Sequence, residues 1–330
     1  MVLLFLLGDV FLHKSNHCCV GGFHMKEELR VFLRRHTFGM LLLNYRRIVH
    51  QKTNLVMYDD ESAIKKMYKK RTNRDLNLEN PLRYTEKLQW NKLNHRNPLM
   101  TQCVDKIEVR KYLIEKGYEK YLTHVVGEYR SVGDIKWAEI PEKCIFKASH
   151  GSSMHLVKTR DMRRLPFMWR LVMNSWLKMN IYIEGREWPY KNVRPGIICE
   201  EFIEPKTDNR LKDYKFFCFS GNPKFIQVDV DLLSDHHINF YDIDWNLLPI
   251  RCQYPNSKEK IPKPLYYSEM LKIASDLSEP FSHVRVDFYQ YDNQLKIGEL
   301  TFFDGSGFYS FHPDEYDFIF GQEFPLIEYK

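Results

Sequence analysis

Two acidic residues, Asp287 and Glu299, occur in the two arms of a predicted β-hairpin near the C-terminus. Strand-like runs flank a Tyr-Asp-Asn-Gln segment whose Asp and Asn favour a turn. A hairpin centred on Asn293 pairs Asp287 with Glu299 and Arg285 with Thr301. Because side chains alternate between the two faces of a strand, all four would lie on one face, and the even-numbered face would be apolar.

Directly opposed carboxylates have Cβ atoms about 5 Å apart and repel one another, so a structural role alone does not explain this pair. A divalent cation between them would turn the repulsion into attraction. Oxygen ligands of this kind suit Mg²⁺, which shares its coordination shell with waters and substrate phosphates. A pairing shifted by one residue would instead place the acids on opposite faces. The pairing alone leaves both possibilities open.

A second group of residues that could do chemistry follows a strand ending at Lys147. There the chain continues as His-Gly-Ser-Ser and enters another strand. A loop of small residues that presents backbone N–H groups beside a lysine can cradle phosphate. It is not a Walker A loop, because the lysine precedes the glycine. An ordinary hairpin turn would have the same composition.

The third group is the acidic pair Glu200 and Glu201, which lies in an otherwise apolar strand and is followed by Asp213 and Lys215. Burying a carboxylate is costly unless something hydrogen-bonds it. An adenine amino group or a ribose hydroxyl could do so. An internal arginine could do it equally well.

The elements that must position these residues fall into two regions. Residues 25–117 are predicted to be helical, with helices at 25–52, 59–71, 85–93 and 99–117. Short β-rich runs follow, with helices predicted at 161–179 and 267–277. The predicted strands are 144–148, 155–158, 196–203, 214–219, 225–230, 239–241, 284–289 and 295–303. Runs of strands with a few helices between them predict an α+β fold with mixed or antiparallel sheets.

The composition is that of a globular chain: 330 residues contain 44% hydrophobic and 28% charged residues. These values exclude a wholly disordered, collagenous or multi-spanning membrane protein. The net charge of +6 is modest, and the basic residues beyond residue 75 are dispersed among acids, so we expect no nucleic-acid partner. Seven cysteines without C-x-x-C spacing indicate a reducing, cytoplasmic location.

The N-terminal segment allows several interpretations. Residues 1–12 are apolar but are interrupted by Asp9 and are too short to span a bilayer. Either the natural chain begins at Met25 or this segment is a short anchor. The basic, amphipathic residues 25–52 could lie on anionic lipid as a peripheral membrane helix, or could form a solvated surface helix.

The order of these features resembles that of ATP-grasp enzymes, and more narrowly that of the TupA-like ATP-grasp family, named for teichuronopeptide biosynthesis. The segments that carry the resemblance are 80–81, 86–90, 104–106, 147–153, 185–190, 213–219, 239–248 and 298–307. The resemblance implies two α+β lobes that clasp ATP. It also implies four regions: an N-terminal extension and basic helical region (1–74), a helical region (75–124), a first lobe (125–203) and a second lobe with the Mg²⁺ site (204–330).

Roles in the first lobe follow from the resemblance. Lys106 and Lys147 would hold the α- and β-phosphates, and a flexible lid over them would be formed by Gly151, Ser152 and Ser153. The residues expected to contact adenine are Glu200, Glu201 and the backbone of Phe202 and Ile203.

In the second lobe, Asp213 or Lys215 would lie near the ribose or the phosphates. Asp287 and Glu299 would bind Mg²⁺. The Thr301 hydroxyl would be a further Mg²⁺ ligand. Because Thr301 stands where most ATP-grasp enzymes have Asn, a second metal ion would bind weakly or not at all. Arg285 would stabilise charge on an acylphosphate or on the tetrahedral intermediate.

The resemblance implies an ATP-dependent ligase that joins a carboxylate to an amine through an acylphosphate, forming a carbon–nitrogen bond in cell-envelope or capsular polysaccharide assembly. The partners would be a carboxylate-bearing saccharide or peptide and an amine donor.

Two other functions are open. A glycosyltransferase could use one of two D-x-D tripeptides, which contain Asp229 and Asp231 or Asp242 and Asp244. The first of these lies in a run that alternates like an ordinary strand with exposed acids. A nucleotide-binding scaffold without catalysis is the third possibility, because of Thr301.

Overall fold

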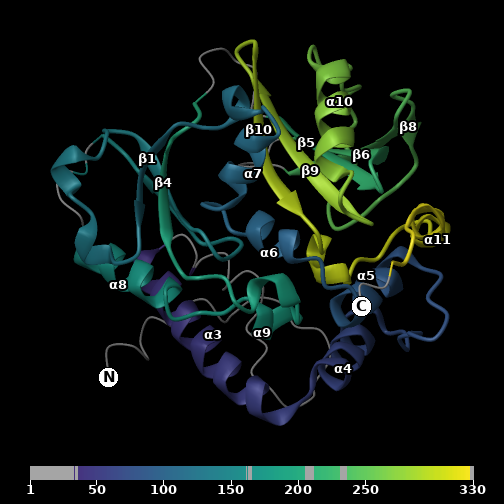
Figure 1. Ribbon diagram of the computed structural model, residues 1–330, viewed down its shortest axis with the longest axis horizontal. Coiled ribbons are helices and arrows are strands. Elements are labelled where there is room, and N and C mark those ends of the chain that lie inside the picture. The colour runs from purple at the N-terminus through teal and green to yellow at the C-terminus, as the bar shows by residue number, and fades with distance from the viewer. Residues whose placement is uncertain are drawn as a thin grey trace, which may run out of the picture.

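Two antiparallel β-sheets dominate the computed structural model, which describes residues 33, 36–160, 162, 166–204, 212–230 and 236–327. The four-stranded sheet has the order β1-β4-β2-β3, and the six-stranded sheet has the order β10-β9-β5-β6-β7-β8. In Figure 1 they occupy opposite sides of the molecule, with helices α6 and α7 between them. Antiparallel sheets with intervening helices confirm the predicted α+β class. The predictions for residues 1–12 and for a start at Met25 fall outside the described residues.

The first sheet contains β1 (Val125–Tyr129), β2 (Cys144–Ala148), β3 (His155–Lys158) and β4 (Ile197–Glu201). The strands of the second sheet are β5 (Lys212–Phe219), β6 (Asn222–Val230), β7 (His237–Asp242), β8 (Leu247–Leu248), β9 (Val284–Tyr291) and β10 (Gln294–Thr301). Strands β1 and β8 are additional to the predicted ones. The first sheet lies wholly within 125–203 and the second within 204–330, while the four-region division itself stays a prediction.

The described helices are α3 (Thr37–Met57), α4 (Asp60–Thr72), α5 (Tyr84–Asn94), α6 (Pro98–Val104), α7 (Val109–Glu115), α8 (Phe167–Trp176), α9 (Tyr182–Gly185), α10 (Tyr267–Ser278) and α11 (Glu315–Glu323). Short 3₁₀ turns occur at η1 (Glu119–Tyr121), η2 (Val132–Asp134), η3 (Trp137–Glu139), η4 (Trp188–Tyr190) and η5 (Asp304–Gly307). Across the described residues, no helix has the combination of length and apolar composition that a transmembrane segment requires.

The single helix predicted for residues 99–117 is wrong, because the chain forms two helices, α6 and α7, with a break at Asp105. The Asp105 carboxylate accepts a hydrogen bond from the backbone N–H of Ile107 at 2.9 Å. The N–H of Lys106 donates to the carbonyl of Ser149 at 2.9 Å instead of continuing the helix. Because Asp competes for backbone N–H groups, it ends a helix readily. The break places Lys106 beside the loop that follows β2.

The β9–β10 hairpin differs from the predicted pairing near its turn and agrees with it at its base. The turn is formed by Asp292 and Asn293, both with positive φ, and Ile297 pairs with Phe288, one residue away from the prediction. A β-bulge between Ile297 and Leu300 then restores the predicted pairing, so Thr301 pairs with Arg285. A bulge inserts one residue and changes which face the following side chains occupy.

Gly298 permits this bulge. A Cβ atom at Gly298 would lie 2.9 Å from the Tyr289 ring and 3.3 Å from the carbonyl oxygen of Asp287. Before the bulge Leu295 and Ile297 are buried, and after it Leu300 is buried, so the apolar face changes from odd to even numbers. Glu299 and Thr301 are thereby placed on the polar face of the sheet.

The apolar face of the second sheet packs against α10 and forms the larger core, which includes Phe216, Val228, Val286 and Phe288. Helices α5 and α11 pack beside it. Asp317 of α11 accepts hydrogen bonds from the backbone N–H of Thr85 at 3.0 Å and from its hydroxyl at 2.8 Å. Gly321 of α11 lies so close to the segment that leads into α5 that a Cβ at this position would be 2.1 Å from the carbonyl oxygen of Leu82 and 2.9 Å from the backbone nitrogen of Tyr84.

We predict that Gly321→Ala lowers the free energy of unfolding by about 1–3 kcal/mol, because the added methyl group meets backbone atoms that must shift. Urea denaturation followed by circular dichroism measures the change. Gly133→Ala is the matched control, since its Cβ would meet only the Ser131 hydroxyl at 3.4 Å, and it should change stability little. Equal effects of the two substitutions would contradict the packing described for α5 and α11.

Candidate active site

Charged side chains gather on the face of the six-stranded sheet that is opposite to α10. Strand pairing sets Lys215 beside Asp287 and Asp213 beside Asp229. We call this surface the carboxylate face, and its members are Asp213, Lys215, Asp229, Arg285, Asp287, Glu299 and Thr301. Alternation along β5, β6 and β9 and the bulge in β10 bring them together. Among the described residues of the carboxylate face, the acidic side chains outnumber the basic ones.

Arg285 is the centre of the carboxylate face and is 6% exposed. Its guanidinium donates to both carboxylate oxygens of Asp287, at 2.7 and 2.6 Å, and also to Asp304. Weaker contacts reach the Thr301 hydroxyl at 3.3 Å and Glu299 at 3.7 Å. Burial opposes the charge of Arg285, but Asp287 and Asp304 outweigh it and hold the pKa of Arg285 well above its usual value.

Asp287 and Glu299 differ in their environments. Asp287 is 2% exposed, and burial raises its pKa although Arg285 opposes the shift. The Glu299 side chain is 47% exposed and accepts a hydrogen bond from the Thr301 hydroxyl at 3.2 Å. Burial opposes ionisation of Glu299, but the charges of Lys106 and Arg285 hold its pKa below the usual value. Glu299 is therefore an ionised and accessible carboxylate.

Lys215 links the other two acids of the face. Its ammonium lies 2.5 Å from Asp229 and 3.4 Å from Asp213. Asp229 also accepts from Gln227 at 2.7 Å and lies 3.2 Å from His236. The Oδ1 atom of Asp213 is buried and has no hydrogen-bond partner. Burial raises the pKa of Asp213 to about 6, with Lys215 opposing and Asp229 adding to the shift.

The first sheet also carries a pair of opposite charges, Lys147 on β2 and Glu200 on β4. The Lys147 ammonium donates to Glu200 at 2.7 Å. Glu200 also accepts from the Thr123 hydroxyl at 2.6 Å and lies 3.6 Å from Arg110. Burial raises the pKa of Glu200, but Lys147 and Thr123 outweigh this and lower it. Protein groups already satisfy this carboxylate, and its expected contact with adenine stays a prediction.

The backbone at the end of β4 was predicted to complete the adenine contact. The N–H of Glu201 donates to the carbonyl of His124 at 3.0 Å, and the Glu201 side chain is exposed. Phe202 and Ile203 follow the strand and are half-buried.

The predicted lid connects β2 to β3 as a short loop. It is closed by the hydrogen bond from the N–H of Ala148 to the carbonyl of Met154, at 2.9 Å. Ser152 and Ser153 are exposed, and Ser153 has a φ of 57°. A Cβ at Gly151 would meet the flexible end of the Met154 side chain and would lie 3.1 Å from the Ile181 side chain, so these two residues pack closely against the loop.

Lys106 connects the loop to the carboxylate face. Its ammonium donates to the carbonyl of Gly151 at 2.7 Å. Burial lowers the pKa of Lys106, Glu299 raises it, and Lys147 lowers it further. The charges of both sheets therefore act on one ammonium group. Lys106 and Lys147 on one side, and the carboxylate face on the other, provide groups that a triphosphate and its cation require.

The residues present fit one Mg²⁺ ion and ATP. Among the described residues, no group of three or more His, Cys, Asp or Glu side chains could hold a metal by itself. Mg²⁺ usually keeps waters and shares its shell with phosphates, so two carboxylates suffice. Glu299 is ionised and accessible, and the unpartnered Oδ1 of Asp213 is a second buried oxygen in the same surface. Asp287 could contribute only an oxygen that Arg285 shares.

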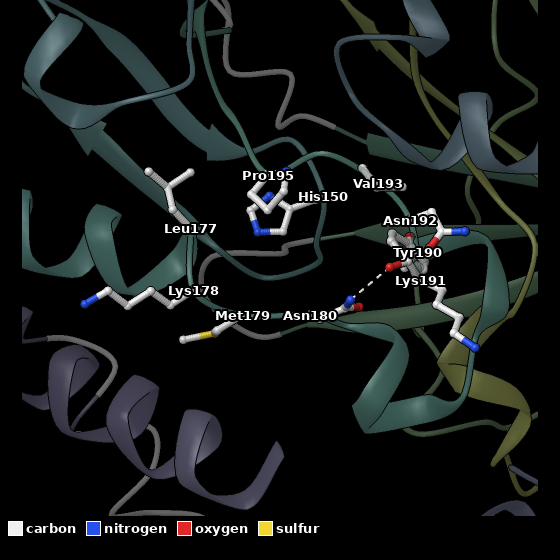
Figure 2. Close-up of a pocket in the computed structure, with 10 residues that line it drawn as sticks. All are labelled: His150, Leu177, Lys178, Met179, Asn180, Tyr190, Lys191, Asn192, Val193 and Pro195. Carbon is white, nitrogen blue, oxygen red and sulfur yellow. Dashed lines mark hydrogen bonds between the residues drawn. The ribbon is translucent and has the colours of Figure 1, made fainter. Parts of the chain in front are cut away.

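A cavity of about 400 Å³ lies behind the loop and takes no part in this site. It is lined by His150, by residues 177–180 at the end of α8, and by residues 190–193 and Pro195. Figure 2 shows the Lys178 and Lys191 side chains extending away from each other rather than toward a common point, and Asn180 donating to the backbone of Lys191. None of the predicted nucleotide or metal ligands lines it.

Several residues of the site were not predicted. Asp304 was hidden in a segment interpreted as a loop, and Gln227 and His236 had no recognised motif. Asp229 was expected to be exposed, which is wrong, since it is 2% exposed. The period-two pattern that joins Asp213 to Asp229 through β5 and β6 was the available signal.

The tripeptides that suggested a glycosyltransferase have structural uses. Asp242 caps a turn, accepting from the N–H groups of Asp244 and Asn246 at 3.0 and 2.8 Å. Asp229 is bound by Lys215, and Asp231 lies outside the described residues.

The chain matches the sequence profile of the TupA-like ATP-grasp family over residues 86–325. It belongs to this family. Family membership confirms the resemblance and supports an ATP-dependent, ligase-type function. No curated protein sequence matches the chain.

Solved structures with a similar fold include three ligases or synthetases. D-alanine–D-alanine ligase from Bacillus anthracis is 16% identical over 61% of this chain and 57% of its own, with a TM-score of 0.36. The ATP-grasp ligase PsnB, complexed with a phosphomimetic variant of its minimal precursor, Mg and ADP, is 11% identical over 72% of this chain and 67% of its own, with a TM-score of 0.38. The D-cycloserine synthetase DcsG is 13% identical over 68% and 70%, with a TM-score of 0.36. The chain thus spans less than two thirds of the Bacillus anthracis ligase, and likeness at this level gives no information on substrate.

We predict that Asp213→Asn stabilises the protein at about pH 7.5 by about 1–3 kcal/mol. The folded state keeps a proton on Asp213 that the unfolded state loses, so native stability falls as the pH rises from about 4 through about 6. The substitution removes this cost, and its benefit should vanish at about pH 4. Denaturant unfolding at the two pH values measures both effects.

Asp242→Asn is the control, because it should change the stability at neutral pH in the opposite direction. Burial opposes ionisation of Asp242, but hydrogen bonds from Asn246 lower its pKa, so the substitution should destabilise the protein at neutral pH. Loss of stability in Asp213→Asn at neutral pH would show instead that its ion pair with Lys215 holds the fold together.

Proposed function

We propose that the protein is an ATP-dependent carboxylate–amine ligase that acts in the assembly of a cell-envelope or capsular polysaccharide. The observation that carries the proposal is the position of Lys106, which binds the carbonyl of Gly151 and is influenced by Lys147 of the first sheet and by Glu299 of the carboxylate face. The family supports the ATP-dependent ligase type. Bound ATP and Mg²⁺ would supply the phosphoryl group and the charge that neutralises it.

In the proposed reaction a substrate carboxylate oxygen attacks the γ-phosphorus, the bond to ADP breaks, and an acylphosphate forms. The amine then attacks the acyl carbon and loses a proton, and inorganic phosphate leaves. Lys106 and Lys147 would orient the phosphates, and Glu299 with Asp287 or Asp213 would hold the cation. Arg285 is fixed by Asp287 and Asp304. Such a preorganised cation can stabilise the developing negative charge without reorganising.

A second cavity, of about 620 Å³, favours an anionic acceptor. Its lining includes Arg251, Phe308, Tyr309 and His312. The Tyr309 ring packs against Gly305, next to the Asp304 that binds Arg285. A guanidinium together with aromatic side chains suits the carboxylate and the ring of an acidic sugar, or the side chain of an acidic peptide.

Glu299→Gln is expected to lower the rate of acceptor-dependent ADP formation about a hundredfold, because it removes the accessible negative charge that would bind the cation. The protein, ATP and Mg²⁺ are incubated with glucuronate-containing oligosaccharides or oligoglutamate, together with free amino acids as amines. ADP is measured by a coupled assay. Because Glu299 is half-exposed, this variant should fold.

Glu128→Gln, which alters an exposed glutamate of β1, is the matched control and should keep full activity. Calorimetry of ATP binding with and without Mg²⁺ needs no acceptor, and Glu299→Gln should weaken only the Mg²⁺-dependent part. Formation of AMP or of free UDP would contradict the proposal. ATP binding without ADP formation across all acceptors would favour a non-catalytic scaffold.

A further inference from the structure

Helix α3 presents a row of large apolar side chains to solvent. Phe38, Leu42, Tyr45 and Val49 are 52%, 42%, 68% and 45% exposed. Their spacing places them within about 60° of arc along a length of about 16 Å, at 3.6 residues per turn and 1.5 Å rise per residue. We call these four side chains the α3 stripe. A surface helix normally has polar residues on its outer side.

The opposite side of α3 is anchored to the first lobe partly by polar contacts. The Asn44 amide donates to the Ser175 hydroxyl at 2.8 Å. Arg47 forms a two-point ion pair with Glu184, at 2.8 and 2.9 Å, and Gln51 donates to the same carboxylate at 2.8 Å. Met40, Leu41 and Ile48 are half-buried against the core of that lobe. The helix therefore contacts the first lobe through both polar and apolar side chains of its inner side, and the α3 stripe lies on the other side.

The charged side chains that α3 itself carries beside the α3 stripe are basic. Arg46 and Lys52 are exposed and flank it on opposite sides, as the helical periodicity requires. The helix contains no Asp or Glu, and Glu184 beside it is engaged by Arg47 on the inner side. Figure 1 shows α3 along one edge of the molecule, next to α8 and α9.

We propose that the α3 stripe binds the surface of an anionic lipid membrane. The apolar side chains would enter the boundary between head groups and acyl chains, while Arg46 and Lys52 contact anionic head groups. A second copy of the chain is a poorer occupant, because a two-fold contact would bring the same basic flanks of both copies together. This inference is independent of the proposed reaction.

Vesicle co-sedimentation tests the proposal with the full chain. Vesicles of phosphatidylcholine alone are compared with vesicles that contain about one third phosphatidylglycerol. We expect binding to the anionic vesicles that weakens with added salt and is much lower on neutral vesicles. Arg46→Gln and Lys52→Gln should each reduce the partition coefficient about fivefold.

The variant Phe38→Ser/Leu42→Ser/Tyr45→Ser/Val49→Ser should lose binding at least tenfold while retaining its circular dichroism spectrum and ATP affinity. Val49→Ser alone is a milder variant if the quadruple one unfolds, and it should reduce binding measurably. Leu265→Ser is the matched control, since Leu265 is 70% exposed elsewhere and should not matter. Equal binding by the control and the stripe variants, or absence of binding by the native chain, would overturn the proposal. So would concentration-dependent dimerisation that the stripe variants abolish.

Discussion

The buried guanidinium of Arg285 is the interaction on which the carboxylate face depends. Asp287 and Asp304 are almost completely buried, and ionised carboxylates are costly to bury without a partner. Arg285 donates to both oxygens of Asp287 and to one oxygen of Asp304, and the two acids together retain the charge of Arg285. The Oδ2 atom of Asp304 is buried and has no hydrogen-bond partner. Removing this cation would leave two buried acids uncompensated. The second sheet could then not present so many carboxylates on one side.

In the two sheets, some of the charged side chains are paired with an opposite charge of the protein, and others keep an atom that is free to bind a ligand. Lys147 is neutralised by Glu200, and Lys215 by Asp229, while Glu299 remains accessible and Asp213 keeps an unpartnered oxygen. Lys106 lies where the charges of both sheets influence it. A cation and a polyphosphate would complete these partial pairings. Such a surface costs stability without ligands, which is a common property of binding sites.

Much of this arrangement could be predicted from the sequence, because β-strand alternation is a strong constraint. The strands that carry Lys147, Asp287 and Glu299 were predicted nearly at their observed bounds. Asp287 and Glu299 share a face, as predicted, because both contact Arg285, but the bulge leaves them without the direct pairing that was predicted. That agreement depends on two deviations that compensate each other. Next to the turn, the strand pairing differs by one residue from the predicted pairing. The bulge at Gly298 then restores the predicted register at the base of the hairpin. Composition marks a turn but does not fix its length or the position of a bulge.

Other features could not be predicted because they arise from contacts between distant segments. The helix break at Asp105 is stabilised by the carbonyl of Ser149, which is far away in the sequence. Asp229 is buried because Lys215 and Gln227 hydrogen-bond it. The exposure of the apolar residues of α3 depends on which side of the helix packs on α8. Local patterns do not contain this information.

The central claim is that one divalent cation binds at the carboxylate face, opposite Lys106 and Lys147. The most direct test is anomalous X-ray diffraction from crystals grown with Mn²⁺ and a non-hydrolysable ATP analogue. The account predicts an anomalous peak within coordination distance of the Glu299 carboxylate and of Asp287 or Asp213, with the analogue's phosphates beside the two lysines. A peak at Asp242 and Asp244, or a nucleotide bound away from Lys147, would contradict it.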